Sequence, residues 1–125
     1  MLAKYGSTRL LDVDLYEVGH HGSHNATTDA LLGAMTPALA VVAMGPESRQ
    51  AEWSAWKYGH PRKVTIERLE RAVSRRRNPR AVRIATAVQA FETHEMSRAI
   101  YATGWDGNVI VSILADGGLR VRTSR

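Results

Sequence analysis

Two short runs of apolar residues, separated by a helical pattern, dominate the first third of the chain. Residues 13–18 and 38–44 have the length and composition of strands that are covered on both faces. Between them, the apolar spacing predicts a helix over Asp29–Met35, with Thr27 or Thr28 as its N-cap. A strand, a helix and a strand of these lengths form a βαβ unit with parallel strands and a right-handed crossover. The pattern therefore predicts an α/β fold.

The remaining elements are predicted from weaker patterns. Residues 2–11 have the composition of a helix that Gly6 weakens. A longer helix is predicted from Val64 or Thr65 to Arg76, because apolar residues recur there at three- and four-residue spacing. Strands are predicted over residues 82–86, 87–91, 99–103, 109–114 and 119–122.

Turn signals organise the last third of the chain. The Asp-Gly pair within residues 105–108 is a hairpin signal, which would join the strand at 99–103 to the strand at 109–114. Asp116 and the two glycines after it make a second turn before the last strand, whose alternation suits a half-exposed edge. Asp106 and Asp116 are both expected in these turns for backbone reasons.

The segment from residue 47 to residue 58 has no regular pattern and carries two tryptophans. Trp53 and Trp56 are three residues apart, so we expect them on one face of a helical turn. We expect that face to pack the segment onto the core, in preference to a role in stacking on bases.

The strongest candidate for chemistry is the polar loop that follows the first predicted strand. Gly19 and Gly22 bracket His20 and His21, and His24 follows, so three imidazoles lie within five residues. Neutral imidazole is the commonest protein ligand for zinc and related ions. The alternative is a capped, hydrogen-bonded turn without a metal. On an extended segment the two adjacent histidines would point to opposite sides, so that one could bind a metal while the other orients it.

Three segments in order along the chain resemble one family of enzymes. They are His20-His21-Gly22-Ser23 after a strand, Tyr58-Gly59-His60-Pro61 before a helix, and residues 101–107 near the end. The chain resembles the metallo-β-lactamase-fold hydrolases, and among them the branch that includes the nuclease-like domain of competence DNA-uptake proteins. The order of these segments matches the C-terminal half of the αββα sandwich of that family.

The resemblance implies a function and a set of site residues. It implies hydrolysis by a water activated at a two-metal site, with zinc as the expected ion, manganese as an alternative, and phosphodiester-type substrates favoured. His20 or His21 would be the metal ligand, with His20 preferred. His60 would hold a substrate phosphate or donate a proton, whereas an N-capping or buried, hydrogen-bonded histidine is the structural alternative.

The early part of the family pattern is missing from this sequence. The family binds its metals mainly through a His-x-His-x-Asp-His motif, and no such motif occurs here. The chain is therefore expected to be a single, partial domain. Its expected partner is the missing N-terminal half or a second copy of itself.

The net charge of +5 suggests a second class of function. Arg75, Arg76 and Arg77 are adjacent at the end of the predicted long helix, and such a patch can bind nucleic acid by neutralising phosphates. A solvated helix end is the simpler interpretation. The alternative to a hydrolase is thus a non-catalytic basic module that binds nucleic acid or pairs with a sheet.

Composition excludes several other classes. The chain has no cysteine, so it has neither disulfides nor thiolate zinc sites, which fits a reducing compartment. No apolar run has the length of a membrane span, and no signal peptide is recognisable. A cytoplasmic location is expected.

Overall fold

The central element of the fold is a small parallel sheet in the order β1-β2-β5. It is seen in a computed structural model that describes residues 1–49 and 51–125. The strands are β1 (Leu15–Glu17), β2 (Leu39–Val42) and β5 (Ile100–Ala102), and both pairings are parallel. Strand β2 lies in the middle, and it is almost completely buried. The predicted α/β class is confirmed.

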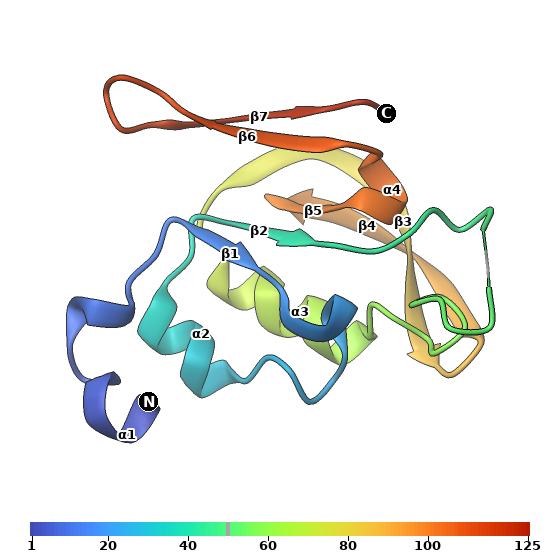
Figure 1. Cartoon of the computed structure of the whole chain (residues 1–125), viewed down its shortest axis with the longest axis horizontal. Helices are drawn as coiled ribbons and strands as arrows, with labels where there is room; N and C mark the ends of the chain where they lie inside the picture. Colours follow the sequence, from blue (N-terminus) through green and yellow to red (C-terminus); the bar gives the residue numbers. More distant parts are fainter. Residues whose placement is uncertain (50) are drawn as a thin grey trace.

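Helix α2 (Asp29–Met35) connects β1 to β2, as predicted. The side chain of Thr28 accepts a hydrogen bond from the backbone N–H of Leu31, so Thr28 is the N-cap. Figure 1 shows α2 beside α3 (Lys63–Ala72), with both helices on the same side of the sheet. Helix α3 buries Ile66 and Leu69 in the core, which explains the apolar spacing in its sequence.

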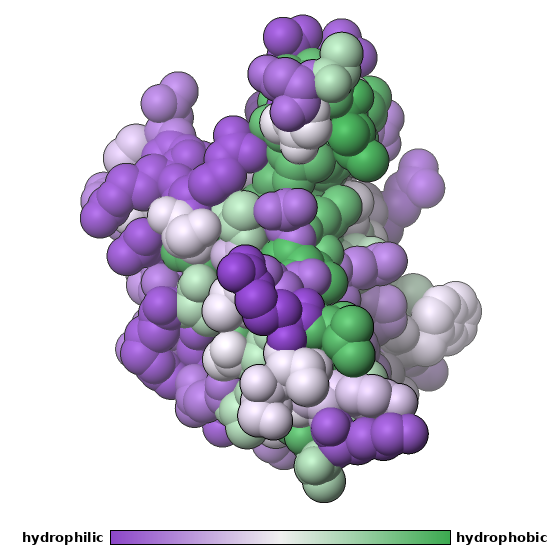
Figure 2. All heavy atoms as spheres, turned by 90° about the vertical axis from the view of Figure 1, so that its left-hand side faces the viewer, coloured by the Kyte–Doolittle hydropathy of each residue, from purple (hydrophilic) through white to green (hydrophobic). Residues whose placement is uncertain are grey.

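Strand β1 differs from its prediction. It was expected to be covered on both faces, but Leu15 is 41% exposed, so one face of β1 is partly uncovered. Further apolar residues reach the surface on the hairpin of β6 (Val109–Ile113) and β7 (Leu119–Thr123) (Figure 2).

The N-terminal helix prediction is wrong in length. Residues 2–11 form two short pieces, α1 (Leu2–Tyr5) and the 3-10 helix η1 (Arg9–Leu11). Both pieces lack buried residues, so no core packing extends them into one helix.

The prediction for the middle of the chain also needs correction. Helix α3 ends at Ala72, and the next residues enter the long strand β3 (Arg76–Ala87), which pairs with β4 (Ala90–Arg98). The pairing register shifts between Arg76 and Arg80, where Pro79 cannot donate a backbone hydrogen bond. The expected break at this proline is therefore an irregularity within a strand.

The predicted hairpin between residues 99–103 and 109–114 does not form. β5 pairs with β2, and the short helix α4 (Thr103–Asp106) follows it at once. β6 pairs with β7 across the turn at Asp116, as expected for the second hairpin. Three separate small sheets result among the described residues.

The two tryptophans do not share a face. Trp56 is 1% exposed, packs in the core and donates its indole N–H to the carbonyl of Gly45 at 2.7 Å. Trp53 is 80% exposed. The segment between them turns without forming a continuous helix, which separates the two side chains.

None of the helices in the described parts of the chain is both long and apolar enough to cross a membrane.

Candidate functional site

The histidine loop begins directly at the carboxyl end of β1 and has an unusual backbone. It forms the 3-10 helix η2 (Gly19–Gly22), in which His20 has φ 48° and His21 has φ 53°. Left-handed conformations cost roughly 1–2 kcal/mol for a residue with a Cβ. Such residues cluster at functional sites, where the surrounding structure holds them in place. The expectation that this pair lies on an extended segment is therefore wrong.

Hydrogen bonding determines the tautomer of His21. Its Nδ1 lies 2.5 Å from the carbonyl oxygen of Ala43, just beyond the end of β2. A carbonyl oxygen only accepts, so Nδ1 carries the proton and Nε2 presents its lone pair. An imidazole oriented in this way by a backbone carbonyl is suited to bind a metal or to accept a proton. Of the two adjacent histidines, this geometry favours His21, whereas the sequence analysis preferred His20.

His60 comes from a distant segment and completes a cluster of three imidazoles. The ring centroids of His20 and His60 are 5.5 Å apart, and those of His20 and His21 are 6.3 Å apart. The cluster lies near the carboxyl ends of β1 and β2, which is where open α/β sheets bind ligands. His60 therefore belongs with the histidine loop.

Close backbone packing brings these segments together. A Cβ on Gly22 would lie 2.7 Å from the Cβ of Pro61, so only glycine lets the two segments approach. The backbone N–H of Arg62 donates to the carbonyl of Gly22 at 2.9 Å. The N–H of His60 donates to the carbonyl of Ala55 at 2.9 Å. These contacts hold His60 beside the loop.

The environment of His60 favours its neutral form. Its side chain is 8% exposed, and Nδ1 has no hydrogen-bond partner within the described residues. Burial lowers the pKa of the His60 imidazole, and the nearby His20, Arg62 and His21 lower that pKa further. A hydrogen bond with the backbone of Gly59 acts in the opposite direction. His60 does not cap α3, whose N-cap is Arg62.

Other residues of the loop have structural roles. Ser23 is buried, and its hydroxyl donates to the side-chain oxygen of Asn25 at 2.9 Å, which stabilises the turn. His24 is exposed. His94 lies in β4 and contacts Glu70 at 3.0 Å.

A depression of about 250 Å³ lies against the loop and is lined by Glu17, His20, His21 and Ala43, among others. Within residues 1–49 and 51–125, no group of three or more His, Asp or Glu side chains has the geometry to hold a metal ion. The described residues thus offer one well-oriented imidazole, at His21, and not a full coordination shell.

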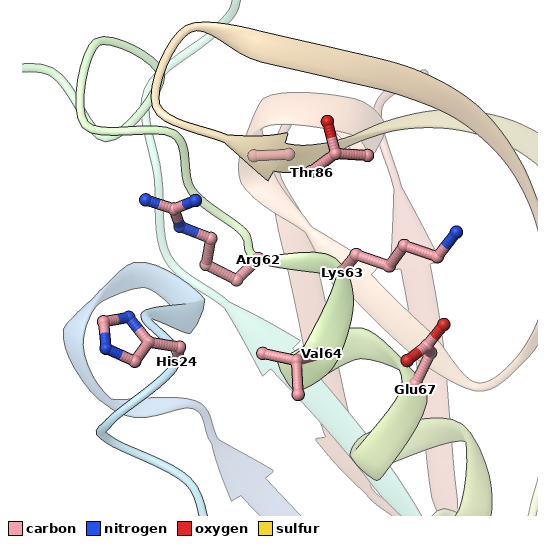
Figure 3. A pocket seen from close by; sticks show the side chains of 7 residues that line it. His24, Arg62, Lys63, Val64, Glu67 and Thr86 are labelled. Carbon is pink, nitrogen blue, oxygen red and sulfur yellow. The ribbon is translucent and has the colours of Figure 1, made fainter.

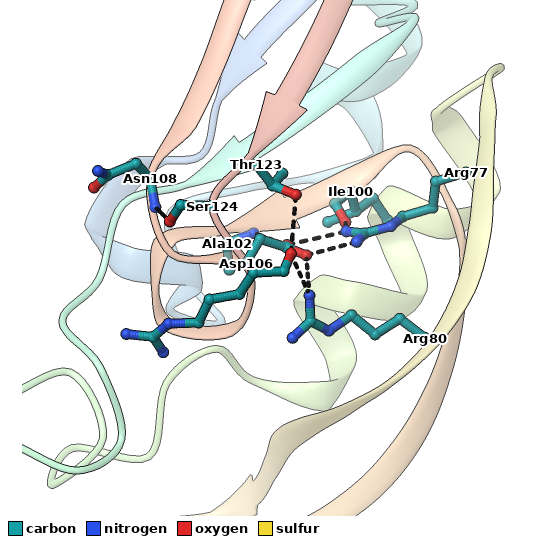
Figure 4. Close-up of polar contacts among 9 residues, drawn as sticks. Arg77, Arg80, Ile100, Ala102, Asp106, Asn108, Thr123 and Ser124 are labelled. Carbon is teal, nitrogen blue, oxygen red and sulfur yellow. Dashed lines mark hydrogen bonds and ion pairs between the residues drawn. The ribbon is translucent and has the colours of Figure 1, made fainter.

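The three arginines expected at a helix end are not one exposed patch. Arg76 and Arg77 lie on β3, and Arg75 and Arg76 are exposed whereas Arg77 is not. Arg75 donates to the carbonyl of Leu119 at 3.0 Å. The side chain of Arg77 is 9% exposed and forms an ion pair with the buried Asp106 at 2.5 Å (Figure 4). Arg77 is therefore committed to the fold.

Sequence reasoning missed this ion pair and interpreted Asp106 as a turn residue. Arg77 and Asp106 are 29 positions apart. The sequence analysis placed Arg77 at the end of a helix and Asp106 in a hairpin turn. No local signal in the sequence connects them.

Comparison with known proteins gives one partial similarity. No protein-family model matches the chain, and no solved structure matches it. Over 59 residues, or 47% of its length, the chain is 36% identical to "Recombination protein 2" of Haemophilus influenzae. The matched stretch is 6% of that protein's length, so the chain spans only a small part of this relative.

Proposed function

We propose that the chain carries the histidine part of a metal-dependent hydrolase site that acts on phosphodiester-type substrates. The observation that carries this proposal is the convergence of His20, His21 and His60 at the carboxyl edge of the parallel sheet. The name of the similar Haemophilus protein supports a substrate class connected with DNA. The proposed architecture is the C-terminal half of an αββα metallo-β-lactamase-like sandwich, in keeping with the order of the sequence motifs.

Each histidine has a distinct proposed role. His21 would bind zinc or manganese through Nε2, because Ala43 holds the proton on Nδ1. His60 is neutral near pH 7, so it can donate one N–H to a phosphate oxygen. His20 lies between the two rings and would contact the same substrate group.

The described residues do not complete a metal shell, so no catalytic step is assigned to the metal. The remaining ligands would come from a partner that completes the fold or from a second copy of the chain. The chain alone should therefore bind zinc more weakly than about 1 μM, since structural zinc sites with four ligands bind far more tightly.

Zinc titration by calorimetry tests the role of His21. His21→Ala should weaken binding at least tenfold, whereas His24→Ala, an exposed histidine of the same loop, should leave binding unchanged. Zinc affinity that is equal in wild type and His21→Ala would refute the assignment. Tight, stoichiometric binding by the wild-type monomer would show a complete site and contradict the partial one.

Hydrolysis is tested with a phosphodiester probe such as bis(p-nitrophenyl) phosphate at saturating zinc or manganese. Metal-dependent cleavage should fall by about 10²-fold or more in His60→Ala and remain unchanged in Arg120→Ala, an exposed arginine on β7. Absence of metal-dependent cleavage by the wild-type chain, once it is assembled with the partner or second copy that completes the site and is saturated with metal, would refute the proposed hydrolase.

The alternative function, a non-catalytic basic module, is less well supported. Much of the basic excess is already paired: Arg77 and Arg80 with Asp106, Arg68 and Arg71 with Asp29, Arg83 with Glu47, and Lys63 with Glu92. Binding of DNA that falls steeply with salt and is unaltered by a chelator would favour this alternative.

A further inference from the structure

A second cavity, of about 420 Å³, lies beside the start of α3. Its walls include His24, Arg62, Val64, Glu67 and Ala85 (Figure 3). The volume falls in the range of small-molecule sites, about 300–1,000 Å³. This space is separate from the depression against His20 and His21, which shares none of these residues.

Arg62 connects the two places. It follows His60 by two residues, and its backbone N–H bonds to Gly22 in the histidine loop. On the other side, the N–H of Ala85 in β3 donates to the carbonyl of Pro61 at 2.8 Å. The segment that carries His60 is thus fixed between the histidine loop and the cavity wall, so a ligand strand could contact both.

The guanidinium of Arg62 has unused donor capacity. Its Nε is buried and has no hydrogen-bond partner within the described residues, which is uncommon for a buried donor. Figure 3 shows the Arg62 side chain and the His24 ring on one side of the cavity, with Lys63 and Glu67 on the other. The buried Nε is closed to a ligand, so an anionic oxygen in the cavity would meet the terminal N–H groups of Arg62, which are well matched to phosphate.

The opposite side of the cavity has a different charge. The ammonium of Lys63 is 2.7 Å from Glu92, whose hydrogen bond and charge raise the pKa of Lys63. Glu67 is then the acidic group facing the cavity, and Val64 lies between it and Arg62 in sequence and in the wall. A cavity with a cationic end, an apolar middle and an acidic end does not suit a bare phosphate.

We propose that this cavity binds one nucleotide of a single nucleic-acid strand, with its phosphate on Arg62 and its sugar and base against Val64. Hydrogen-bond donors of the base or the sugar face Glu67. This proposal rests on the proposed function, because it places the neighbouring phosphodiester of the same strand at the histidine cluster. It adds a subsite that selects nucleic acid over other phosphodiesters.

Binding of a fluorescein-labelled 12-nucleotide adenine strand, measured by anisotropy in EDTA, tests the subsite without any metal. Arg62→Ala should weaken binding at least tenfold and reduce the slope of log K against log salt by about 0.7. Arg62→Lys keeps the charge and loses the planar fork, so it should show an intermediate loss. Glu67→Gln should weaken binding, because an amide oxygen accepts hydrogen bonds from the base or the sugar less strongly than a carboxylate does.

Arg120→Ala is the matched control, since Arg120 is an exposed arginine on β7 outside the cavity lining. It should change affinity less than twofold. Equal affinity of Arg62→Ala and wild type, or an equal loss in Arg120→Ala, would overturn the proposal. Displacement of the strand by inorganic phosphate at micromolar concentration would also overturn it and identify a site for free phosphate.

The same variants separate this proposal from the hydrolase. If Arg62→Ala loses strand binding while the completed wild-type assembly shows no metal-dependent cleavage, the subsite is supported and the hydrolase is refuted. If cleavage of bis(p-nitrophenyl) phosphate depends on His21 while Arg62→Ala binds the strand as tightly as wild type, the hydrolase is supported and the subsite is refuted.

Discussion

Removing the charge of Asp106 should destabilise the fold more than any change at the histidines. Asp106 is fully buried at the end of α4. Its carboxylate accepts two hydrogen bonds from Arg77, at 3.0 and 2.5 Å, one from Arg80 at 3.1 Å and one from the backbone N–H of Ala102 at 3.0 Å. Figure 4 shows these donors around the carboxylate, with Arg77 and Arg80 from β3 and Ala102 from β5.

Asp106→Asn keeps the size of the side chain and leaves the cation of Arg77 without a counter-ion. Breaking a buried ion pair from one side costs about 3–5 kcal/mol. Arg77 also donates to the carbonyl of Ile100 and lies over the ring of Tyr101 at 4.3 Å, so it cannot easily turn out to solvent. The bond to Arg80 adds little, because the side chain of Arg80 is more exposed.

This free energy converts into a large change in melting temperature. The entropy of unfolding is about 0.26 kcal/mol/K for a chain of this size, so the loss corresponds to about 11–19 °C. Thermal melts followed by circular dichroism, with urea titrations for the free energy, would measure it. Arg76→Ala is the control, because Arg76 is exposed on the same strand and should change stability by less than about 0.5 kcal/mol.

A double variant tests whether the unpaired cation of Arg77 causes the loss of stability. Arg77→Met combined with Asp106→Asn removes the stranded cation, so it should be more stable than Asp106→Asn alone. If Asp106→Asn melts within about 3 °C of wild type, the carboxylate is not the organising group that its contacts indicate.

Three further predictions concern other parts of the molecule. In metal-free protein, the pKa of His60 should lie below the ordinary histidine pKa of about 6.5. Near and below that pH the folded state then binds fewer protons than the unfolded state, so the free energy of unfolding falls as the pH drops. NMR titration and melts at several pH values would check this, and a His60 pKa at or above the ordinary value would contradict it. Thr28→Ala should cost about 1 kcal/mol, because it removes the cap on the N–H of Leu31; urea unfolding measures the loss, and Thr28→Ser should restore it. The open edge of β1 and the exposed Leu15 should promote self-association, which sedimentation across a dilution series would detect, and a monomer at every concentration would show that this edge is protected.

The local pattern of the sequence was enough to predict the βαβ unit. Asp29–Met35 has its own cap and apolar stripe, and the run around β2 is apolar throughout because it lies in the middle of the sheet. The last hairpin was also predicted, since an Asp-Gly turn forms from neighbouring residues. The paired histidines were singled out by residue type and by the glycines around them, whereas His60 was singled out by the family resemblance of the turn that carries it.

Only the tertiary structure decided which distant residues meet. β5 pairs with β2 despite the hairpin signal after it, because in this place Ile100 and Ala102 are completely buried in the core. The same packing turns Asp106 inward, where Arg77 must neutralise it, so a residue typical of turns becomes part of the core. His60 joins His20 and His21 because Gly22 allows Pro61 to approach, a contact between segments about 40 positions apart. Residue type indicated the candidate chemistry, but through-space packing determined its geometry.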